Sequence, residues 1–242
     1  MIDLRDKSDL QVYPISEGAV TIEFGKTVDE DIVNRVNAFD RLLQQKAMPG
    51  MYQTVPAYAS LTVFFDLLTL FNAPLPGKTG FDKARAYLLG LNEQTSGFED
   101  AGQSEIITVP VCYGGVFGYD LEYVAGHTKL DSYEVIKLHS EVVYKVCMVG
   151  FIPGFAYLGG LNPALEVPRK ATPVKVSPGA VGIAGRQTGV YPLETPGGWQ
   201  IIGRTPLRLF DAKRSQPSLL KANDMVKFEP ISLSEFEKYS GG

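Results

Sequence analysis

Residues 178–192 read PGAVGIAGRQTGVYP and contain four glycines and two prolines. They belong to a longer stretch, residues 150–206, which holds 11 of the chain's 25 glycines and 8 of its 16 prolines. Inside a helix, glycine costs about 1 kcal/mol and proline about 3 kcal/mol relative to alanine. The stretch is therefore predicted to fold as short strands and turns, which excludes a helical bundle in this half of the chain.

The remainder of the second half fits the same architecture. Two helices are predicted ahead of the stretch, at 119–126 and at 131–145, and Asp131 and Glu134 form a capping-box pair at the start of the second. Short strands are predicted at 105–112, 146–151, 181–184, 200–202, 207–210 and 225–228. Short strands separated by glycine and proline turns indicate a barrel or a sandwich.

The first hundred residues alternate strand and helix patterns. Thr27 is placed to cap the first predicted helix, and three acidic residues follow it in the first turn. The pattern fits a β-α-β-β-α-β order, and the alternative is an unrelated α+β domain with two helices on one face of its sheet. The predicted strands are 19–24, 52–58 and 61–67, and the predicted amphipathic helices are 28–45 and 81–91.

Composition narrows the class of protein. The polar, small-residue segment 92–103 predicts a linker, so we expect one domain at 1–100 and a second at 104–242. Apolar residues make up 45% of the 242 residues and charged residues 21%, which excludes wholesale disorder. The net charge is −4 and no run of Lys or Arg stands out, so we expect no nucleic acid partner.

Membrane insertion and metal binding are not expected either. The longest nearly apolar stretch, 61–71, is interrupted by Asp66 and is shorter than the ~20 residues of a membrane helix. The charged N-terminal residues lack the apolar core of a signal peptide. Cys112 and Cys147 are therefore expected to stay reduced, and no Cys/His spacing typical of a zinc site is present.

Several polar and aromatic residues of the glycine-rich stretch are candidates for a site. Arg186, Gln187 and Thr188 offer a cation, an amide and a hydroxyl in consecutive positions, which suits a carboxylate, phosphate or amide substrate. The alternative for these three is a solvated turn. Trp199 is expected either in the core or as a flat wall for a ring such as adenine. Arg204 is expected near a strand end, facing an acidic ligand or Glu194.

Other candidates carry weaker signals. His139 falls on the helix predicted at 131–145, where a single histidine is more often a structural hydrogen-bonding group than a catalyst. The segment 150–160, which includes Phe155, is aromatic and apolar, contains no phosphate-binding loop, and is more typical of a packed turn. No nucleophile motif is present, because Gly-x-Ser-x-Gly is absent and both cysteines lie in apolar settings.

The chain resembles one protein family over essentially its whole length. This family includes the B subunit of 5-oxoprolinase and the sporulation kinase inhibitor, and it is also called allophanate hydrolase subunit 1 or carboxyltransferase subdomains C and D. The motifs that carry the resemblance are Tyr113-Gly114-Gly115, Phe117-Gly118, Asp120-Leu121, His139-Ser140, Gly150-Phe151-x-Pro153-Gly154-Phe155-x-Tyr157-Leu158, residues 179–192 and Pro196-Gly197-Gly198-Trp199.

The resemblance implies an α+β N-terminal ferredoxin-like domain followed by a mainly-β cyclophilin-like barrel domain, in a cytoplasmic protein. It implies a subunit of an ATP-dependent 5-oxoprolinase, inactive alone, that converts 5-oxo-L-proline, ATP and water to L-glutamate. Its partners would be a sister subunit of the allophanate hydrolase subunit 2 type and a lactam-utilisation-type subunit, with ATP shared with or supplied through them.

Two other functions stay open within the family. One is inhibition of a sporulation sensor histidine kinase by direct binding that blocks autophosphorylation. The other is a carboxyltransferase-type role in a biotin-dependent system that resembles urea carboxylase. A partner that carries a biotin domain would favour the second.

The enzymatic hypothesis assigns roles to individual residues. His139, Glu194 and Arg186 are expected to be catalytic, with Arg186 neutralising phosphate or carboxylate charge and either Glu194 or His139 moving a proton. The expected substrate-binding residues are Phe155, Gln187, Thr188, Tyr191, Trp199 and Arg204. The family commonly has an arginine where this chain has Val174. If that arginine holds an anion in the family, Lys175 would have to take over this role here.

Overall fold

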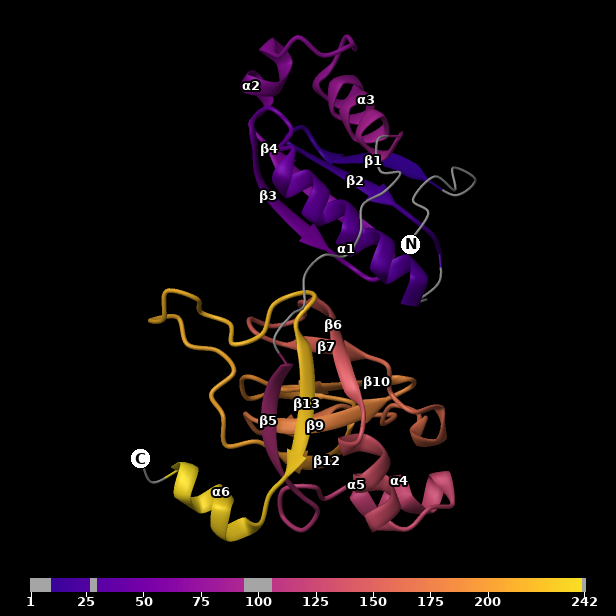
Figure 1. Cartoon of the computed structure of the whole chain (residues 1–242), viewed down its shortest axis with the longest axis vertical. Coiled ribbons are helices and arrows are strands. Elements are labelled where there is room, and N and C mark those ends of the chain that lie inside the picture. Colours follow the sequence, from indigo (N-terminus) through magenta and orange to yellow (C-terminus); the bar gives the residue numbers. More distant parts are fainter. Residues whose placement is uncertain (1–9, 27–29, 94–105, 241–242) are drawn as a thin grey trace. The chain divides into compact units, whose positions relative to one another are not determined.

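The computed structural model describes residues 10–26, 30–93 and 106–240. The chain divides into two compact units, Met1–Gly102 and Gln103–Gly242, which are drawn in Figure 1. Each unit has its own hydrophobic core. Within the described ranges, no helix combines the length and the apolar character that crossing a membrane requires.

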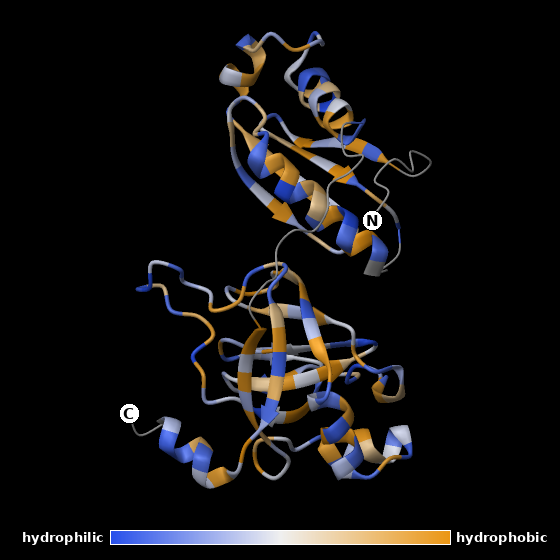
Figure 2. Cartoon of the chain, viewed as in Figure 1, coloured by the Kyte–Doolittle hydropathy of each residue, from blue (hydrophilic) through white to orange (hydrophobic). Residues whose placement is uncertain are grey.

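The first unit is a four-stranded antiparallel sheet with two long helices on one face. Its strand order is β1-β2-β4-β3, and Ile22 and Val63 of the sheet meet Phe39 and Leu88 of the helices in a shared core. Figure 2 shows hydrophobic and hydrophilic residues alternating along the ribbon of α1, as expected for a helix with one buried face. The elements are β1 (Gln11–Ser16), β2 (Ala19–Glu23), α1 (Glu30–Gln45), β3 (Met51–Pro56), β4 (Ser60–Phe65), α2 (Leu67–Asn72) and α3 (Gly80–Glu93).

This unit differs from the predicted order in its first strand. β1 was not predicted, because most of its side chains are exposed and no clear alternation marks it as a strand. It precedes the other strands, so the described order is β-β-α-β-β-α-α and not β-α-β-β-α-β.

The predicted strand at 61–67 ends earlier, at Phe65. The Asp66 carboxylate accepts hydrogen bonds from the backbone N–H and the hydroxyl of Thr69, at 2.8 and 2.6 Å, and so starts α2. The predicted cap Thr27 lies outside the described residues. So does the predicted linker, apart from its first two residues, which end α3.

The second unit contains a closed barrel of seven strands in the order β10-β7-β6-β13-β5-β12-β9. β5 and β13 are parallel, and the other neighbouring pairs are antiparallel. Along β9, Val181 and Ile183 belong to the barrel core, whereas Ala180 and Ala184 belong to a second apolar cluster on the outer face. The strands are β5 (Ile106–Tyr113), β6 (Val143–Val149), β7 (Ala156–Gly159), β9 (Ala180–Ala184), β10 (Gln187–Val190), β12 (Gln200–Arg204) and β13 (Met225–Pro230).

Short helices and a two-stranded sheet lie outside the barrel strands. Asp131 and Glu134 form the predicted capping box, through hydrogen bonds of 2.7 and 2.9 Å. The elements are α4 (Leu121–Thr128), α5 (Ser132–Ser140), the 3-10 turn η1 (Pro163–Leu165), α6 (Leu233–Ser240), and a two-stranded arm of β8 (Val174–Val176) and β11 (Thr195–Gly197).

Two predictions for this unit are wrong. The helix predicted at 131–145 ends at Ser140, because the chain from Val143 onwards pairs with β13 as β6. The strand predicted at 207–210 is absent from this part of the described chain, where Phe210 makes a single isolated bridge with Ser218. Asp211 turns the chain directly afterwards, since its carboxylate accepts a hydrogen bond from the Lys213 N–H.

Candidate functional site

The residues predicted as a site fall into separate settings, and the first is the interior of the barrel. His139, in the last turn of α5, is completely buried. Its Nδ1 lies 2.8 Å from the Tyr113 hydroxyl and its Nε2 lies 2.8 Å from Thr188 Oγ1. The Thr188 hydroxyl in turn donates to the Gly182 carbonyl at 3.0 Å. The imidazole ring stacks on Phe228 with a centroid distance of 4.6 Å.

The direction of each hydrogen bond in this chain follows from its last member. A carbonyl only accepts, so the Thr188 proton goes to Gly182 and the Thr188 oxygen accepts from Nε2–H of His139. Nδ1 then accepts from the Tyr113 hydroxyl. Burial lowers the pKa of His139 to about 3, so the ring is neutral at physiological pH.

This geometry favours a structural role for His139. Both ring nitrogens are engaged, and the side chain has no exposed surface through which a substrate proton could arrive. Thr188 is buried in the same network and faces away from solvent. Catalysis by His139 and substrate binding by Thr188 stay predictions.

The second setting is an aromatic cluster on the outer face of the barrel. Phe155 lies edge-on to Trp199 and to Tyr191, with centroid distances of 5.4 and 5.0 Å. Glycines make room for the indole: a Cβ on Gly189 would lie 3.1 Å from Trp199 Cζ3 and 2.7 Å from the Ala156 carbonyl oxygen. The glycines of the 178–192 stretch therefore serve close packing here.

The cluster is packed and not open. Trp199 is 4% exposed, which confirms its expected place in a core and leaves no flat face for a ring ligand. Burial raises the pKa of the Tyr191 phenol to about 12, and its oxygen keeps a hydrogen bond with the backbone of Trp199. Tyr191 is therefore a neutral core group at physiological pH.

The third setting is the exposed surface. Arg186 lies at the tip of the β9–β10 hairpin, directly after Gly185, whose positive φ of 56° allows the tight turn. Gln187 is half-buried at the start of β10. Glu194 forms an exposed ion pair of 2.9 Å with Lys175, so both side chains already have a charged partner. Among the described residues no ion pair joins Arg204 to Glu194.

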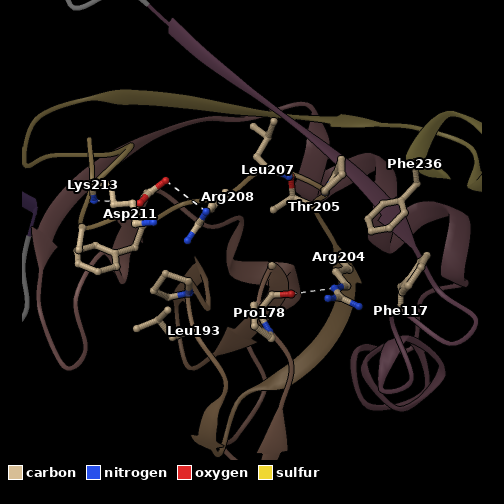
Figure 3. A pocket seen from close by; sticks show the side chains of 15 residues that line it. Phe117, Pro178, Leu193, Arg204, Thr205, Leu207, Arg208, Asp211, Lys213 and Phe236 are labelled. Carbon is tan, nitrogen blue, oxygen red and sulfur yellow. Dashed lines mark hydrogen bonds and ion pairs between the residues drawn. The ribbon is translucent and has the colours of Figure 1, made fainter. Parts of the chain in front are cut away.

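Arg204 belongs to a fourth setting, a surface pocket with a volume of about 670 Å³, shown in Figure 3. Arg204 ends β12, as predicted, and its Nε donates to the Pro178 carbonyl at 2.8 Å. The guanidinium lies over the Phe117 ring at 5.8 Å. Among the described residues neither terminal nitrogen of Arg204 has an ion-pair partner, so both can receive an anion.

Two further cations and one carboxylate form another wall of this pocket. Arg208 Nη1 lies 3.3 Å from Asp211 Oδ2, and the Asp211 carboxylate also holds the backbone N–H of Lys213 at 3.0 Å. Figure 3 shows these three residues on the side away from Arg204. The lining thus has three cations for one carboxylate, a balance of charge that suits an anionic ligand.

The C-terminal helix supports the Arg204 wall. Phe236 of α6 is 7% exposed, and its ring lies 4.4 Å from the ring of Phe117. Since Phe117 also contacts the Arg204 guanidinium, α6 braces the arginine through an aromatic side chain.

Sequence reasoning missed most of this pocket. The available signal was the run of cations at 204–214, where Arg204, Arg208, Lys213 and Arg214 face a single acidic residue, Asp211. A second missed feature is the ion pair of Lys170 with Asp120 at 2.5 Å, with both side chains 16% exposed. The same Asp120 oxygen accepts from the Ile201 N–H, which ties the start of α4 to β12.

Together these features define a class of protein. A unit with helices on one face of a four-stranded sheet precedes a closed barrel, and the barrel carries a basic pocket whose described lining contains no cysteine, serine or histidine. Among the described residues, no three His, Cys, Asp or Glu side chains gather to hold a metal ion. This is a two-unit α+β protein whose barrel carries a basic surface pocket.

Comparison with known proteins gives the family. The model of the "Carboxyltransferase domain, subdomain C and D" family matches residues 10–220, so the chain belongs to this family. It is 40% identical to the B subunit of 5-oxoprolinase from Bacillus subtilis (strain 168), over 95% of this chain and 96% of the relative. It is 41% identical to the B subunit of 5-oxoprolinase from Haemophilus influenzae, over 90% of this chain and 97% of the relative.

A solved structure is similar in fold and sequence. The crystal structure of TTHA0988 aligns with a TM-score of 0.73 and 33% identity, and the alignment covers 88% of this chain. The same alignment covers 40% of the TTHA0988 chain, so this protein corresponds to part of a longer polypeptide there.

Proposed function

We propose that the chain is the B subunit of an ATP-dependent 5-oxoprolinase, which converts 5-oxo-L-proline, ATP and water to L-glutamate. The observation that carries the proposal is the 40% identity to the corresponding Bacillus subtilis protein along 95% of this chain and 96% of that one. Because the alignment runs almost from end to end, it takes in both units and not only a shared module.

The chemistry explains why a basic pocket is needed. A lactam is an unreactive amide, and ATP supplies activation by phosphorylating its oxygen. Arg204 is fixed by Pro178 and Phe117, so it binds and orients an anionic group of the substrate without first having to be ordered. The positive lining of the pocket suits the negative charge that phosphoryl transfer brings together.

The remaining predicted residues act outside this pocket. Arg186 and Glu194 are exposed, so in this proposal they reach substrate only at an interface with another subunit, Arg186 neutralising charge and Glu194 moving a proton. Gln187 follows Arg186 at the start of β10 and is half-buried, and in this proposal it orients the substrate at an interface of the same kind. The buried Thr188, Tyr191, Trp199 and Phe155 support the barrel beneath it, as His139 does.

Other subunits follow from the same proposal. The chain works in the cytoplasm with a sister subunit of the allophanate hydrolase subunit 2 type and a lactam-utilisation-type subunit, and it is inactive alone. The alignment covers 40% of the longer TTHA0988 chain, which supports a function that needs a further region beside the one matched here. ATP is shared with these partners, which agrees with the lack of a phosphate-binding loop in this sequence.

We also assign the two units, as domains 1–100 and 104–242, to a ferredoxin-like and a cyclophilin-like fold. Two helices on one face of a four-stranded antiparallel sheet support the first assignment, with β1 occupying the edge that the last strand fills in the usual order. The closed barrel flanked by α4 and α5 supports the second.

Reconstitution tests the function. The chain is mixed with its two partner subunits, and 5-oxoproline cleavage and ATP hydrolysis are measured together. We expect Arg204→Ala to lower kcat/KM for 5-oxoproline by about 100-fold, as expected when a preorganised charge contact is lost. The matched control is Arg85→Ala, an exposed arginine of α3 in the other unit, which should leave both rates unchanged. Wild-type mixtures that fail to cleave 5-oxoproline would refute the proposal.

A second candidate function is a carboxyltransferase-type role, which the family description favours. It requires a partner that carries a biotin domain. Such a mixture would be supplied with ATP and a biotin carboxylase. Transfer of the carboxyl group of labelled bicarbonate to urea, without 5-oxoproline cleavage, would replace the first proposal with this one.

A further inference from the structure

The pocket around Arg204 is a positive region in a negatively charged protein. The chain has 27 acidic and 23 basic residues and a net charge of −4. The lining of the pocket nevertheless contains Arg204, Arg208 and Lys213 against Asp211 alone. Such a local reversal of sign raises the concentration of anions at the pocket.

The cations are arranged as two separate groups. Arg204 lies on one wall, between Pro178 and Phe117. Within the described part of the chain, only its Nε donates a hydrogen bond to the protein. Arg208 and Lys213 stand on the other wall, as Figure 3 shows. A guanidinium that keeps both terminal nitrogens is able to bind one carboxylate or phosphate group in a bidentate way.

The carboxylate of Asp211 does not cancel the second group. Asp211 is shared by Arg208 at 3.3 Å and Arg214 at 3.9 Å, and it also accepts from the Lys213 backbone. One negative charge therefore orients two arginines and fixes the turn that presents Lys213. Lys213 has no ion-pair partner among the described residues, so this wall keeps an uncompensated charge.

Much of the remaining lining of the pocket is apolar. It includes Pro192, Leu193 and Phe210, none of which offers a charged side chain. A ligand that fills the pocket therefore needs an uncharged middle and a negative group at each end. The volume of about 670 Å³ is ample for such a molecule.

We propose that this pocket binds a small ligand with two anionic groups, one held by Arg204 and the other by Arg208 with Lys213. The anionic groups are carboxylates or phosphates, since the same cations recognise both. The inference rests on the proposed function only for the place of this ligand in the reaction. There it makes the pocket the site of a species with two anionic groups, such as a dicarboxylate or a diphosphate.

Binding to the full chain, without partner subunits, tests the inference. Isothermal titration calorimetry at low salt compares glutarate and pyrophosphate, which carry two anionic groups, with acetate, which carries one. We expect at least one of these two ligands to bind at least about 10-fold more tightly than acetate, because each can contact both walls. Tighter binding of glutarate alone identifies carboxylates as the ligand, pyrophosphate alone identifies phosphates, and both together show that charge spacing decides.

Variants show whether both walls take part. Arg204→Gln and Arg208→Gln should each weaken the preferred dianion about 10-fold, and the double variant should bring it to the affinity of acetate. Arg85→Gln, which removes an exposed arginine of the other unit, is the matched control and should change nothing. Dianions that bind no better than acetate would overturn the inference, and so would binding that survives both pocket substitutions.

The two proposals fail separately. A reconstituted complex that cleaves 5-oxoproline while the chain binds no dianion refutes the two-anion pocket and leaves the function standing. A chain that binds a dianion through both walls, in a complex that does not cleave 5-oxoproline, refutes the function and leaves the pocket standing.

Discussion

Two polar regions of the barrel unit use their side chains in opposite ways. In the interior, Tyr113, His139 and Thr188 form a chain in which every polar atom has a partner and no group carries a charge. In the pocket, Arg204 and Lys213 carry charges for which the described residues supply no ion-pair partner. The first arrangement stabilises the fold, and the second is available to a ligand.

The difference shows why residue type alone is a weak guide to function. A histidine is the usual choice for proton transfer, yet His139 is fully enclosed in the barrel unit. Arg204 belongs to no recognisable sequence motif. Among the residues that the structure describes, however, only its Nε is used in a hydrogen bond to the protein, and its two terminal nitrogens can bind a ligand. What separates the two regions is whether the hydrogen-bonding capacity is already used.

The largest expected effect is a loss of stability when the interior hydrogen-bond chain is interrupted. His139→Ala should lower the free energy of unfolding by about 3 kcal/mol or more, because it removes a buried ring and leaves the Tyr113 and Thr188 hydroxyls each short of a partner. Urea denaturation followed by circular dichroism measures the change.

His127→Ala is the matched control for that variant, since His127 is the chain's other histidine and lies exposed on α4. We expect it to change the free energy of unfolding by less than about 0.5 kcal/mol. If both histidine variants proved equally stable, the interior chain would contribute little and the contrast drawn above would fail.

Lowering the pH from 7 to 5 is expected to have a smaller effect, a decrease of about 2 kcal/mol in the free energy of unfolding. Burial holds the pKa of His139 at about 3, below the 6.5 of an exposed histidine, so between these values the unfolded chain binds a proton that the folded chain does not. The contribution of His139 to stability is therefore complete above pH 6.5 and declines as the pH falls toward 3. Unfolding midpoints at pH 7 and pH 5 should show the loss for the wild type, and His139→Gln should remove this part of the pH dependence.

The smallest expected effect on stability comes from a substitution in the pocket. Arg208 is 70% exposed, so its ion pair with Asp211 adds little to stability, and Arg208→Gln should change the free energy of unfolding by less than about 0.5 kcal/mol. Ligand affinity should nonetheless fall in the same variant. A destabilisation as large as that of His139→Ala would mean that the pocket is part of the structural core.

Elements with a clear local pattern of buried apolar residues were predicted from the sequence. The helix with Phe39 on its buried face and the strand that contains Ile183 lie where the sequence pattern predicted them. β1 was missed because exposed edge residues carry no alternation, and the end of α5 was missed because Val143 is recruited by β13 through a contact distant in sequence. Local propensity does not encode such pairings.

The site was harder to predict for a similar reason. Arg186, Gln187 and Thr188 are adjacent in sequence, but Arg186 lies at the hairpin tip and only the other two belong to β10. Because a strand sends neighbouring side chains to opposite faces, Thr188 is buried in the barrel while Gln187 is only half-buried. Arg204 was identified as a candidate, whereas Arg208 and Lys213 were not, because the turn that Asp211 creates decides which cations share a wall.

The hydrogen-bond chain from Tyr113 to Gly182 has a polarity, since each proton points the same way along it. A phenylalanine in place of Tyr113 would leave Nδ1 without its donor, and a valine in place of Thr188 would leave Nε2–H without its acceptor. The three positions are therefore expected to be inherited together or exchanged together in evolution, as a single unit whose parts lie far apart along the chain.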